Sequence, residues 1–309
     1  MRLPWWRPVL GTLAFVVLTF GARGLLPLTL AALLWCAGPS RWWERSLIAL
    51  LVAVGLVFTI PPTLNPRTID PLDAALGTFT LIAAAAFAGG ALVAPGGALR
   101  QAFRASLWGA AGTGALGLLL RGPLFWSELH WSTVREVTTD VGYIVERRPE
   151  IAVYAPGLVQ FLANAFPALL LLSTLAALVL AWQWHVRISR QPLGAPIGAF
   201  HEFRFGDQWV WGLVSALVIW AVPRLAVLKW AAVNVGIVLG AMYVLRGTAV
   251  VVAIGAAVGV PVWILTAGAV LAGVLIVPLF VLVPGLWTLG VFDTWLAFRQ
   301  RRYTRPTAS

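Results

Sequence analysis

The chain has 309 residues, 60% of them hydrophobic and 11% charged, with a mean hydropathy of +0.88 and a formal net charge of +11. A soluble domain usually carries about 25% charged residues, so this composition excludes an ordinary soluble protein. It predicts an all-α polytopic membrane helix bundle, because backbone polar groups in hydrocarbon must be paired within each helix.

Apolar runs that approach the ~20 residues needed to cross a bilayer recur along the chain, and we expect about 8–10 transmembrane spans. The candidate ranges are 9–21, 24–38, 46–60, 73–93, 104–121, 156–184, 208–223, 226–245, 248–266 and 270–292. The first two are short for full spans and could instead form a tilted or re-entrant hairpin. Pro261, Pro278 and Pro284 can kink or break the last two.

Residues 1–200 are predicted to form an N-terminal membrane bundle. The single cysteine, Cys36, lies in an apolar run, so an intramolecular disulfide is excluded. The stretch Gly112-Thr113-Gly114-Ala115-Leu116-Gly117 has the spacing of a dinucleotide-binding motif. That motif lies between a strand and a helix, whereas these glycines lie inside an apolar run. We therefore expect them to allow close packing of one helix face.

One segment of this bundle, 123–156, looks soluble and predicts an outer amphipathic helix near 127–148. Ser127 is a plausible N-cap and Pro149 ends the pattern. The apolar positions at helical spacing are Trp131, Val134, Val137, Val141, Ile144 and Val145. The helix is either a connector on the membrane surface or a lid over a ligand cavity.

Residues 201–302 are predicted to form C-terminal membrane helices, followed by a short tail at 303–309. Two G-x-x-x-G pairs, at 236–240 and 255–259, would each place glycines on one helix face. They indicate close packing within the chain or between copies of it. Asn234 lies inside a predicted span, where its amide must find a partner. That partner is either a group on another helix or a ligand.

Asp293 ends the last apolar run at a helix C-terminus, where its charge opposes the helix dipole at a cost of about 0.3–1 kcal/mol. A cation should therefore compensate it. Arg246 ends another predicted span at the same membrane face, and Arg204 precedes one. We predict that Asp293 pairs with Arg246 or Arg204. Glu202, two residues before Arg204, completes the polar candidates, which either anchor helices or contact a ligand.

The sequence contains no pattern that indicates catalysis, a cofactor or a metal ion. His130 is far from His185 and His201, and no cysteine or carboxylate spacing makes them a metal site. No serine lies in a nucleophile pattern, and the G-x-x-x-x-G-K-[ST] motif for ATP binding is missing. We expect no catalytic residue, no cofactor, no metal ion and no enzymatic activity.

The basic residues are distributed unevenly over the predicted loops, which predicts orientation. More of them, including Arg2, Arg41, Arg246 and Arg299, fall on one side than on the other. The positive-inside rule makes that side cytoplasmic, with both termini inside a multi-pass protein of the cell inner membrane. Basicity of this kind favours the lipid bilayer as partner and not nucleic acid. Tryptophans at span ends are expected in the headgroup layer, and they include Trp42, Trp126, Trp131, Trp182 and Trp220.

Three blocks of the sequence resemble a known family. They are Glu202-Phe203-Arg204-Phe205, Asn234 with Leu245 to Val251, and Leu289 to Trp295 with Phe298-Arg299. In this order they resemble the YybS-like family of uncharacterised bacterial integral membrane proteins. That family is similar to the S components of energy-coupling-factor transporters. The resemblance implies an S-component-like bundle in residues 1–200, which binds a small molecule and relies on a separate ATPase module.

Two function classes follow from these observations. The first is a small-molecule binding or transport component without its own ATPase, whose candidate partners are a small-molecule ligand, a separate ATPase module and a second copy of the chain. The second is a non-transporting membrane scaffold or assembly protein. A cavity of at least ~300 Å³ with convergent polar groups would favour the first class, and a fully packed bundle would favour the second.

Overall fold

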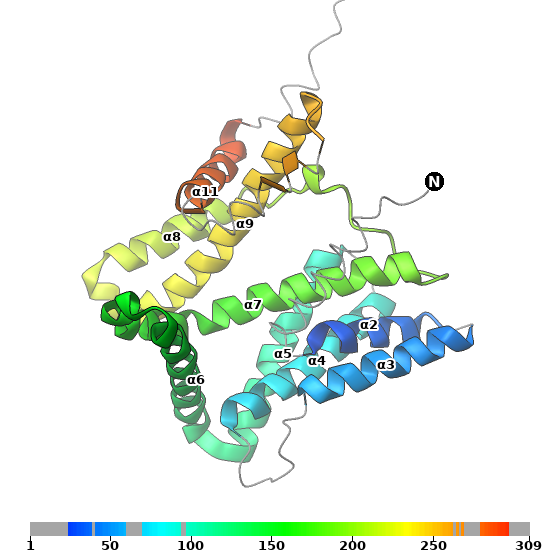
Figure 1. The fold of residues 1–309 in the computed structure, drawn as a ribbon, viewed down its shortest axis with the longest axis horizontal. Coiled ribbons are helices and arrows are strands. Elements are labelled where there is room, and N and C mark those ends of the chain that lie inside the picture. Colours follow the sequence, from blue (N-terminus) through cyan, green and yellow to red (C-terminus); the bar gives the residue numbers. More distant parts are fainter. Residues whose placement is uncertain are drawn as a thin grey trace, which may run out of the picture. The chain divides into compact units, whose positions relative to one another are not determined.

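The computed structural model describes residues 24–38, 41–59, 70–93, 97–261, 264–265, 267–268 and 279–296. Within these ranges every regular element is helical. The chain divides into two compact units, Met1–Ile197 and Gly198–Ser309, whose elements are shown in Figure 1. This division falls three residues before the predicted one at residue 200.

Unit 1 is built around a short apolar helix. Its helices are α2 (Leu25–Cys36), α3 (Trp42–Thr59), α4 (Pro71–Val93), α5 (Ala98–Arg121), α6 (Phe125–Arg147) and α7 (Ala155–Ile188), with 3-10 turns η1 (Gly122–Leu124) and η2 (Pro149–Tyr154). Helix α2 packs against α3, α4 and α7, and Leu26 and Leu33 on it are fully buried. A helix that is apolar on all sides belongs in such a core. Its 12 residues extend only about 18 Å, less than the ~30 Å of a bilayer core.

The start of α2 depends on Gly24, which contacts α3. Gly24 has a left-handed φ of 86°, and a Cβ built on it would lie 2.7 Å from the Gly55 carbonyl oxygen. Gly38, at the other end of α2, also has a positive φ but has nothing within 4 Å of its Cβ position. Both glycines therefore need a left-handed backbone conformation, but only Gly24 is packed closely against α3.

Replacing Gly24 with alanine should therefore destabilise the protein more than the same change at Gly38. Both variants incur about 1–2 kcal/mol for a left-handed alanine, and Gly24→Ala adds about 1–3 kcal/mol for overpacking against α3. Equilibrium unfolding of the purified protein in mixed micelles measures both changes. If the two variants lost the same free energy of unfolding, the close contact between Gly24 and α3 would not add to the cost of the substitution.

The glycines of α5 serve helix packing, as predicted. Helix α5 continues through residues 112–117 without a break. A Cβ on Gly109 would contact Phe79 and Ala83 of α4, and one on Gly112 would lie 2.7 Å from Ile82. Of the glycines in the motif itself, Gly112 thus packs against α4, whereas Gly114 and Gly117 lie against Trp126 and Phe125 of α6.

Four helical segments are long and apolar enough to cross a membrane: Trp42–Thr59, Pro71–Val93, Pro149–Ile188 and Pro223–Ala257. Three shorter apolar helices accompany them: Leu25–Cys36, Trp209–Ala221 and Val281–Leu296. Many of their large apolar side chains are exposed, for example Val57 at 73% and Leu81 at 50%. These residues face lipid in a membrane, so the protein is an all-α polytopic membrane helix bundle in contact with the bilayer.

Helix α6 covers the predicted amphipathic segment, but the buried face differs from the prediction. Val141 is buried as expected, whereas Trp131 is 69% exposed and Ser132 and Thr133 are buried. The cause is Asp70, which precedes α4 and accepts hydrogen bonds from Ser132 and Arg135. These bonds hold a polar strip of α6 against the N-terminus of α4.

Unit 2 is organised around one long helix. Its elements are η3 (Phe200–Glu202), α8 (Trp209–Ala221), η4 (Pro223–Leu228), α9 (Lys229–Ala257) and α11 (Leu279–Leu296). Helix α9 packs against α8, α11, η3 and η4. The predicted break between spans 226–245 and 248–266 is wrong, because α9 runs through it. Pro284 lies inside α11 without ending it, and Pro278 lies outside the described residues.

The first predicted G-x-x-x-G pair packs within the chain. The Cβ position of Gly236 lies 4.0 Å from Ala216 on α8, and that of Gly240 lies 3.9 Å from Trp287 on α11. The second pair does not share a helix face, because Gly259 follows the end of α9 with a φ of 81°. Its spacing was therefore misread as a packing motif.

Most of the tryptophans predicted at span ends are exposed, whereas Trp182 is buried. Trp42, Trp126 and Trp220 are 80%, 53% and 60% exposed, whereas Trp182 is 2% exposed. The Trp182 indole N–H donates to the Ala195 carbonyl at 3.1 Å, and its ring meets Phe87 edge-on. Trp182 thus belongs to the core of unit 1. The predicted cytoplasmic termini lie outside the described residues.

Candidate functional site

The predicted polar residues of unit 2 meet at Arg246, in the middle of α9. Arg246 is 5% exposed. Its Nε donates to Asp293 Oδ2 at 3.0 Å, and its Nη2 donates to the Asp293 carbonyl at 3.1 Å. Its Nη1 donates to Asp207 Oδ1 at 2.6 Å and to the Phe205 carbonyl at 2.8 Å. The planar guanidinium has several donors in a fixed geometry, and here it joins α9, α11 and the segment before α8.

The predicted pairing of Asp293 is confirmed with Arg246. Asp293 is 2% exposed, so both charges of the pair are buried. Among the described residues Arg246 is the arginine in an ion pair with Asp293, and Arg204 is exposed. A buried ion pair of this kind is strongly destabilised when one partner is removed.

This pairing also explains why Arg246 lies inside a helix and not in the loop that was predicted between residues 245 and 248. A charged side chain inside an apolar helix is costly unless it finds a partner. The sequence placed Arg246 at a membrane face, where water would solvate it. Asp293, Asp207 and the Phe205 carbonyl solvate it instead, so the helix continues on both sides.

Two contributors to the cluster were not predicted. Asp207 and the Phe205 carbonyl come from the segment between η3 and α8, and the Phe205 ring packs edge-on against Tyr243 at 5.5 Å. Asp207 could have been considered, because it is an acid just before a predicted span. The Phe205 carbonyl carries no signal in the sequence, since a backbone acceptor is present at every residue.

The other predicted polar residues lie apart from this cluster. The Asn234 amide donates to the Trp230 carbonyl one turn earlier in α9, at 2.9 Å, and an interhelical or ligand contact of Asn234 stays a prediction. Glu202 is exposed, with its carboxylate 3.9 Å from His201 Nε2. The structure thus brings together Arg246 and Asp293, and leaves Asn234, Arg204 and Glu202 outside.

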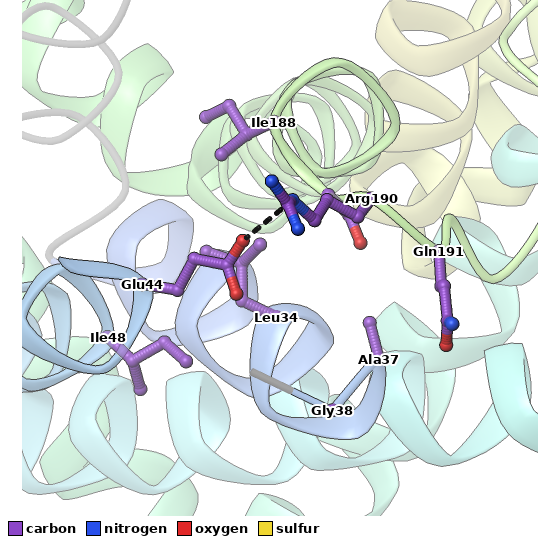
Figure 2. Close-up of a pocket in the computed structure, with 9 residues that line it drawn as sticks. Leu34, Ala37, Gly38, Glu44, Ile48, Ile188, Arg190 and Gln191 are labelled. Carbon is purple, nitrogen blue, oxygen red and sulfur yellow. Dashed lines mark ion pairs between the residues drawn. The ribbon is translucent and has the colours of Figure 1, made fainter. Parts of the chain in front are cut away.

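Unit 1 contains a pocket whose lining residues the sequence did not predict (Figure 2). Its volume is about 200 Å³. The residues that line it are Leu34, Ala37, Gly38, Glu44, Ile48, Ile188, Ser189, Arg190 and Gln191. They come from the C-terminal end of α2, the first two turns of α3 and the C-terminal end of α7 with the residues after it. The one signal in the sequence was Glu44, the only acid among residues 1–69.

Glu44 provides the buried charge of this pocket. It is 9% exposed and lies in the first turn of α3, where an acid is favoured by the helix dipole. Its Oε2 accepts a hydrogen bond from the Arg41 backbone N–H at 3.1 Å. Its Oε1 lies 4.0 Å from Arg190 Nε, and the Arg190 side chain is 50% exposed. The dashed line in Figure 2 marks this ion pair across the pocket.

The residues that follow α7 are held in place by side chains of its last turns. The Leu193 backbone N–H donates to His185 Nε2 at 3.2 Å, and the Ile197 N–H donates to Gln183 Oε1 at 3.4 Å. Trp182 binds the Ala195 carbonyl of the same segment. Residues 189–197 therefore turn back along α7, and Ser189, Arg190 and Gln191 line the pocket.

A second cavity in unit 1 is an open apolar groove between α2 and α3, with a volume of about 910 Å³. Small side chains line it from both helices, including Ala31, Ala32, Ala49 and Ala53. The criterion set by the sequence analysis for a solute-binding protein is a cavity of at least ~300 Å³ that also has convergent polar groups. The Glu44 pocket has the polar groups and the groove has the volume, so neither cavity meets both criteria.

The chain is similar to one family of membrane proteins. Residues 148–294 match the family model described as "Predicted membrane protein (DUF2232)". The matched range includes α7, the segment after it and unit 2 through Asp293, and so it contains all five predicted polar residues. No curated protein and no solved structure matches the chain.

Proposed function

We propose that the protein is a small-molecule binding component of a membrane transport system, without an ATPase of its own. The observation that carries this proposal is the Glu44 pocket, in which a buried carboxylate and a half-exposed arginine face each other across a cavity of about 200 Å³. Ligand sites combine apolar walls with a few placed polar groups. Leu34, Ile48 and Ile188 provide the walls. The proposal includes no catalytic step.

A separate energising module is the second part of the proposal. The open groove between α2 and α3 supports it, because exposed apolar surface lined by small residues suits close docking of another membrane helix. Ala49 and Ala53, four residues apart on α3, both line this groove. The S components that the chain resembles dock through an A-x-x-x-A stripe in their first span, and the corresponding contact proposed here uses Ala49 and Ala53, which fall in the third predicted span. A location in the bacterial inner membrane follows from the same resemblance.

Native mass spectrometry of the full-length protein, purified in detergent, tests the binding function. We expect a retained small molecule on the wild-type protein. Ala37→Phe should remove it, because the new ring fills the pocket without changing its charge. Ala85→Phe is the matched control, since Ala85 is an exposed residue of α4 away from the pocket, and this variant should retain the molecule.

Two outcomes would count against this function. If neither the wild type nor Ala85→Phe carries a molecule, the pocket is not a ligand site under these conditions. If Ala37→Phe retains the molecule as well as the wild type, the ligand binds elsewhere. Co-purification of an ATPase that is lost on Ala49→Leu substitution would support the docking part independently.

The alternative function, a non-transporting scaffold, receives no specific support from unit 2. This alternative used the basic cytoplasmic face and the G-x-x-x-G helices to recruit partners. Gly236 and Gly240 instead contact Ala216 and Trp287 of the same chain. We therefore do not extend this alternative.

A further inference from the structure

The first three turns of α5 have an exposed face that combines two arginines with large apolar side chains. The opposite face is buried in unit 1, where a Cβ on Gly109 would contact Phe79 and Ala83 of α4. The side chains on the exposed face are Leu99, Arg100, Phe103, Arg104, Leu107 and Trp108.

This face lies at the depth of a membrane surface. Helix α4 is long and apolar enough to cross the bilayer and ends at Val93, whose side chain is 86% exposed. Helix α5 begins at Ala98 and packs along α4, so its first turns lie at the membrane surface where α4 ends. Arginine side chains at this depth reach the headgroup layer with their guanidinium groups.

The chain supplies no acid to these two arginines. The sequence has no Asp or Glu between Asp73 and Glu128, and the first turn of α5 contains none. Among the described residues, no ion pair involves Arg100 or Arg104. Their charges are therefore left for a group outside the chain to compensate.

The positions of the two arginines are electrostatically unfavourable for the isolated helix. Arg100 and Arg104 are four residues apart, so their side chains are neighbours on one helix face, and like charges at this spacing destabilise a helix. Arg100 also lies in the first turn of α5, where the helix dipole is positive and disfavours a cation. A bound anion would relieve both effects at once.

The surroundings of the arginines indicate which anion fits. Guanidinium groups bind phosphate oxygens through paired, charge-assisted hydrogen bonds. Phe103, Leu107 and Trp108 are 40%, 52% and 67% exposed on the same face. A soluble phosphate would make no use of these apolar side chains, whereas the acyl chains of a phospholipid would cover them.

We propose that this face of α5 is a binding site for an anionic phospholipid. The headgroup phosphate lies between Arg100 and Arg104, and the acyl chains follow Phe103, Leu107 and Trp108 toward the bilayer core. The inference goes beyond the proposed transport function and does not depend on it, because no residue of the Glu44 pocket takes part.

Native mass spectrometry of the full-length protein in a neutral detergent tests the proposal, with dioleoyl phosphatidylglycerol as the anionic probe and dioleoyl phosphatidylcholine as the probe with the same acyl chains. We expect the wild type to retain at least one phosphatidylglycerol that phosphatidylcholine does not replace at equal concentration. Each arginine should contribute about fivefold to the affinity, as a basic residue near an anionic membrane surface does. The double variant Arg100→Gln with Arg104→Gln should therefore retain one phosphatidylglycerol fewer at the lipid concentration that fills the wild-type site.

The matched control is the double variant Arg147→Gln with Arg148→Gln. It removes the same total charge from two exposed arginines at the end of α6, and it should retain as much phosphatidylglycerol as the wild type. A second measurement checks folding. Without anionic lipid the Arg100 and Arg104 double variant should unfold at a Tm no lower than that of the wild type, since a like-charge contact is removed. Added phosphatidylglycerol should raise the Tm of the wild type more than that of this variant, because a ligand stabilises the state that binds it.

Four results would overturn the inference. The first is a wild type that retains phosphatidylglycerol no better than phosphatidylcholine, and the second is an unchanged number of retained lipids in the Arg100 and Arg104 double variant. The third is an equal loss in the Arg147 and Arg148 control, which would assign the effect to net charge. The fourth is release of the bound lipid by inorganic phosphate at the same concentration, which would identify a site for soluble phosphate and not for a lipid.

Discussion

Replacing Arg246 with methionine, while Asp293 stays in place, should destabilise unit 2 by about 3–5 kcal/mol, as expected when a buried charge loses its partner. Asp293 is 2% exposed, so water cannot take over the role of the guanidinium. The substitution also leaves the Phe205 carbonyl and Asp207 without their donor. Equilibrium unfolding in mixed micelles measures the loss.

A double-mutant cycle separates the ion pair from the packing around it. Asp293→Leu alone removes the buried carboxylate that pairs with Arg246 and leaves the guanidinium with Asp207 and two backbone carbonyls. This variant should also be strongly destabilised. The double variant Arg246→Met with Asp293→Leu should lose less than the two single losses added together, because no uncompensated charge remains in the pair. Additive losses would mean that the two side chains do not interact in the folded protein.

Arg204→Met is the matched control for this cycle. Arg204 is exposed, and substitutions at exposed positions usually change stability by less than about 0.5 kcal/mol. Asp207→Asn provides an intermediate case, because the Asp207 side chain is 67% exposed although it contacts Arg246 at 2.6 Å. Its loss should be closer to the ~0–1 kcal/mol of a surface ion pair.

Alanine at Gly247 or Gly290 should separate α9 from α11 and cost about 1–3 kcal/mol or more through overpacking. A Cβ on Gly247 would overlap the Leu286 carbonyl oxygen, and a Cβ on Gly290 would overlap the Tyr243 carbonyl oxygen. Both obstacles are backbone atoms, so no side-chain rotation can relieve them. The helices would have to move apart, and Arg246 and Asp293 on the adjacent turns would move with them.

Gly285→Ala is the control for this prediction, and its effect on the stability of the protein should have the opposite sign. Gly285 lies on the same helix α11, is exposed, and has nothing within 4 Å of its Cβ position. Alanine in a helix is favoured over glycine by roughly 0.5–1 kcal/mol, so this variant should be slightly more stable. A stable Gly290→Ala protein would show that α9 and α11 do not cross as closely as the structure has them.

The ion pair between Arg246 and Asp293 was partly predictable from the sequence. Because Asp293 lies at the C-terminal end of an apolar run, a cation was expected to pair with it. Arg246 was one of the two candidate arginines. The geometry selected Arg246, because α9 and α11 cross at Gly247 and Gly290 and bring the neighbouring residues within bonding distance. The helix break predicted at Arg246 was wrong for the same reason, since a partner from another element was not visible in the local pattern.

The Glu44 pocket was not predicted, because its residues come from three places in the chain. Leu34 and Ala37 lie at the end of α2, Glu44 and Ile48 lie in the first two turns of α3, and residues 188–191 span the end of α7 and the segment after it. None of these segments carries a motif. The position of the last segment depends on one hydrogen bond that Trp182 donates to the Ala195 carbonyl and on two that His185 and Gln183 accept from the backbone N–H groups of Leu193 and Ile197. Such backbone groups are present at every residue.

The sequence alone determined that this protein is a helical membrane bundle, because long apolar runs leave the backbone no other way to pair its polar groups in lipid. Only the tertiary structure decided where charge is buried, which helices continue and where a pocket opens. Those outcomes depend on contacts between residues distant in the chain, such as the 47 positions between Arg246 and Asp293, and hydrophobic periodicity carries no record of such contacts.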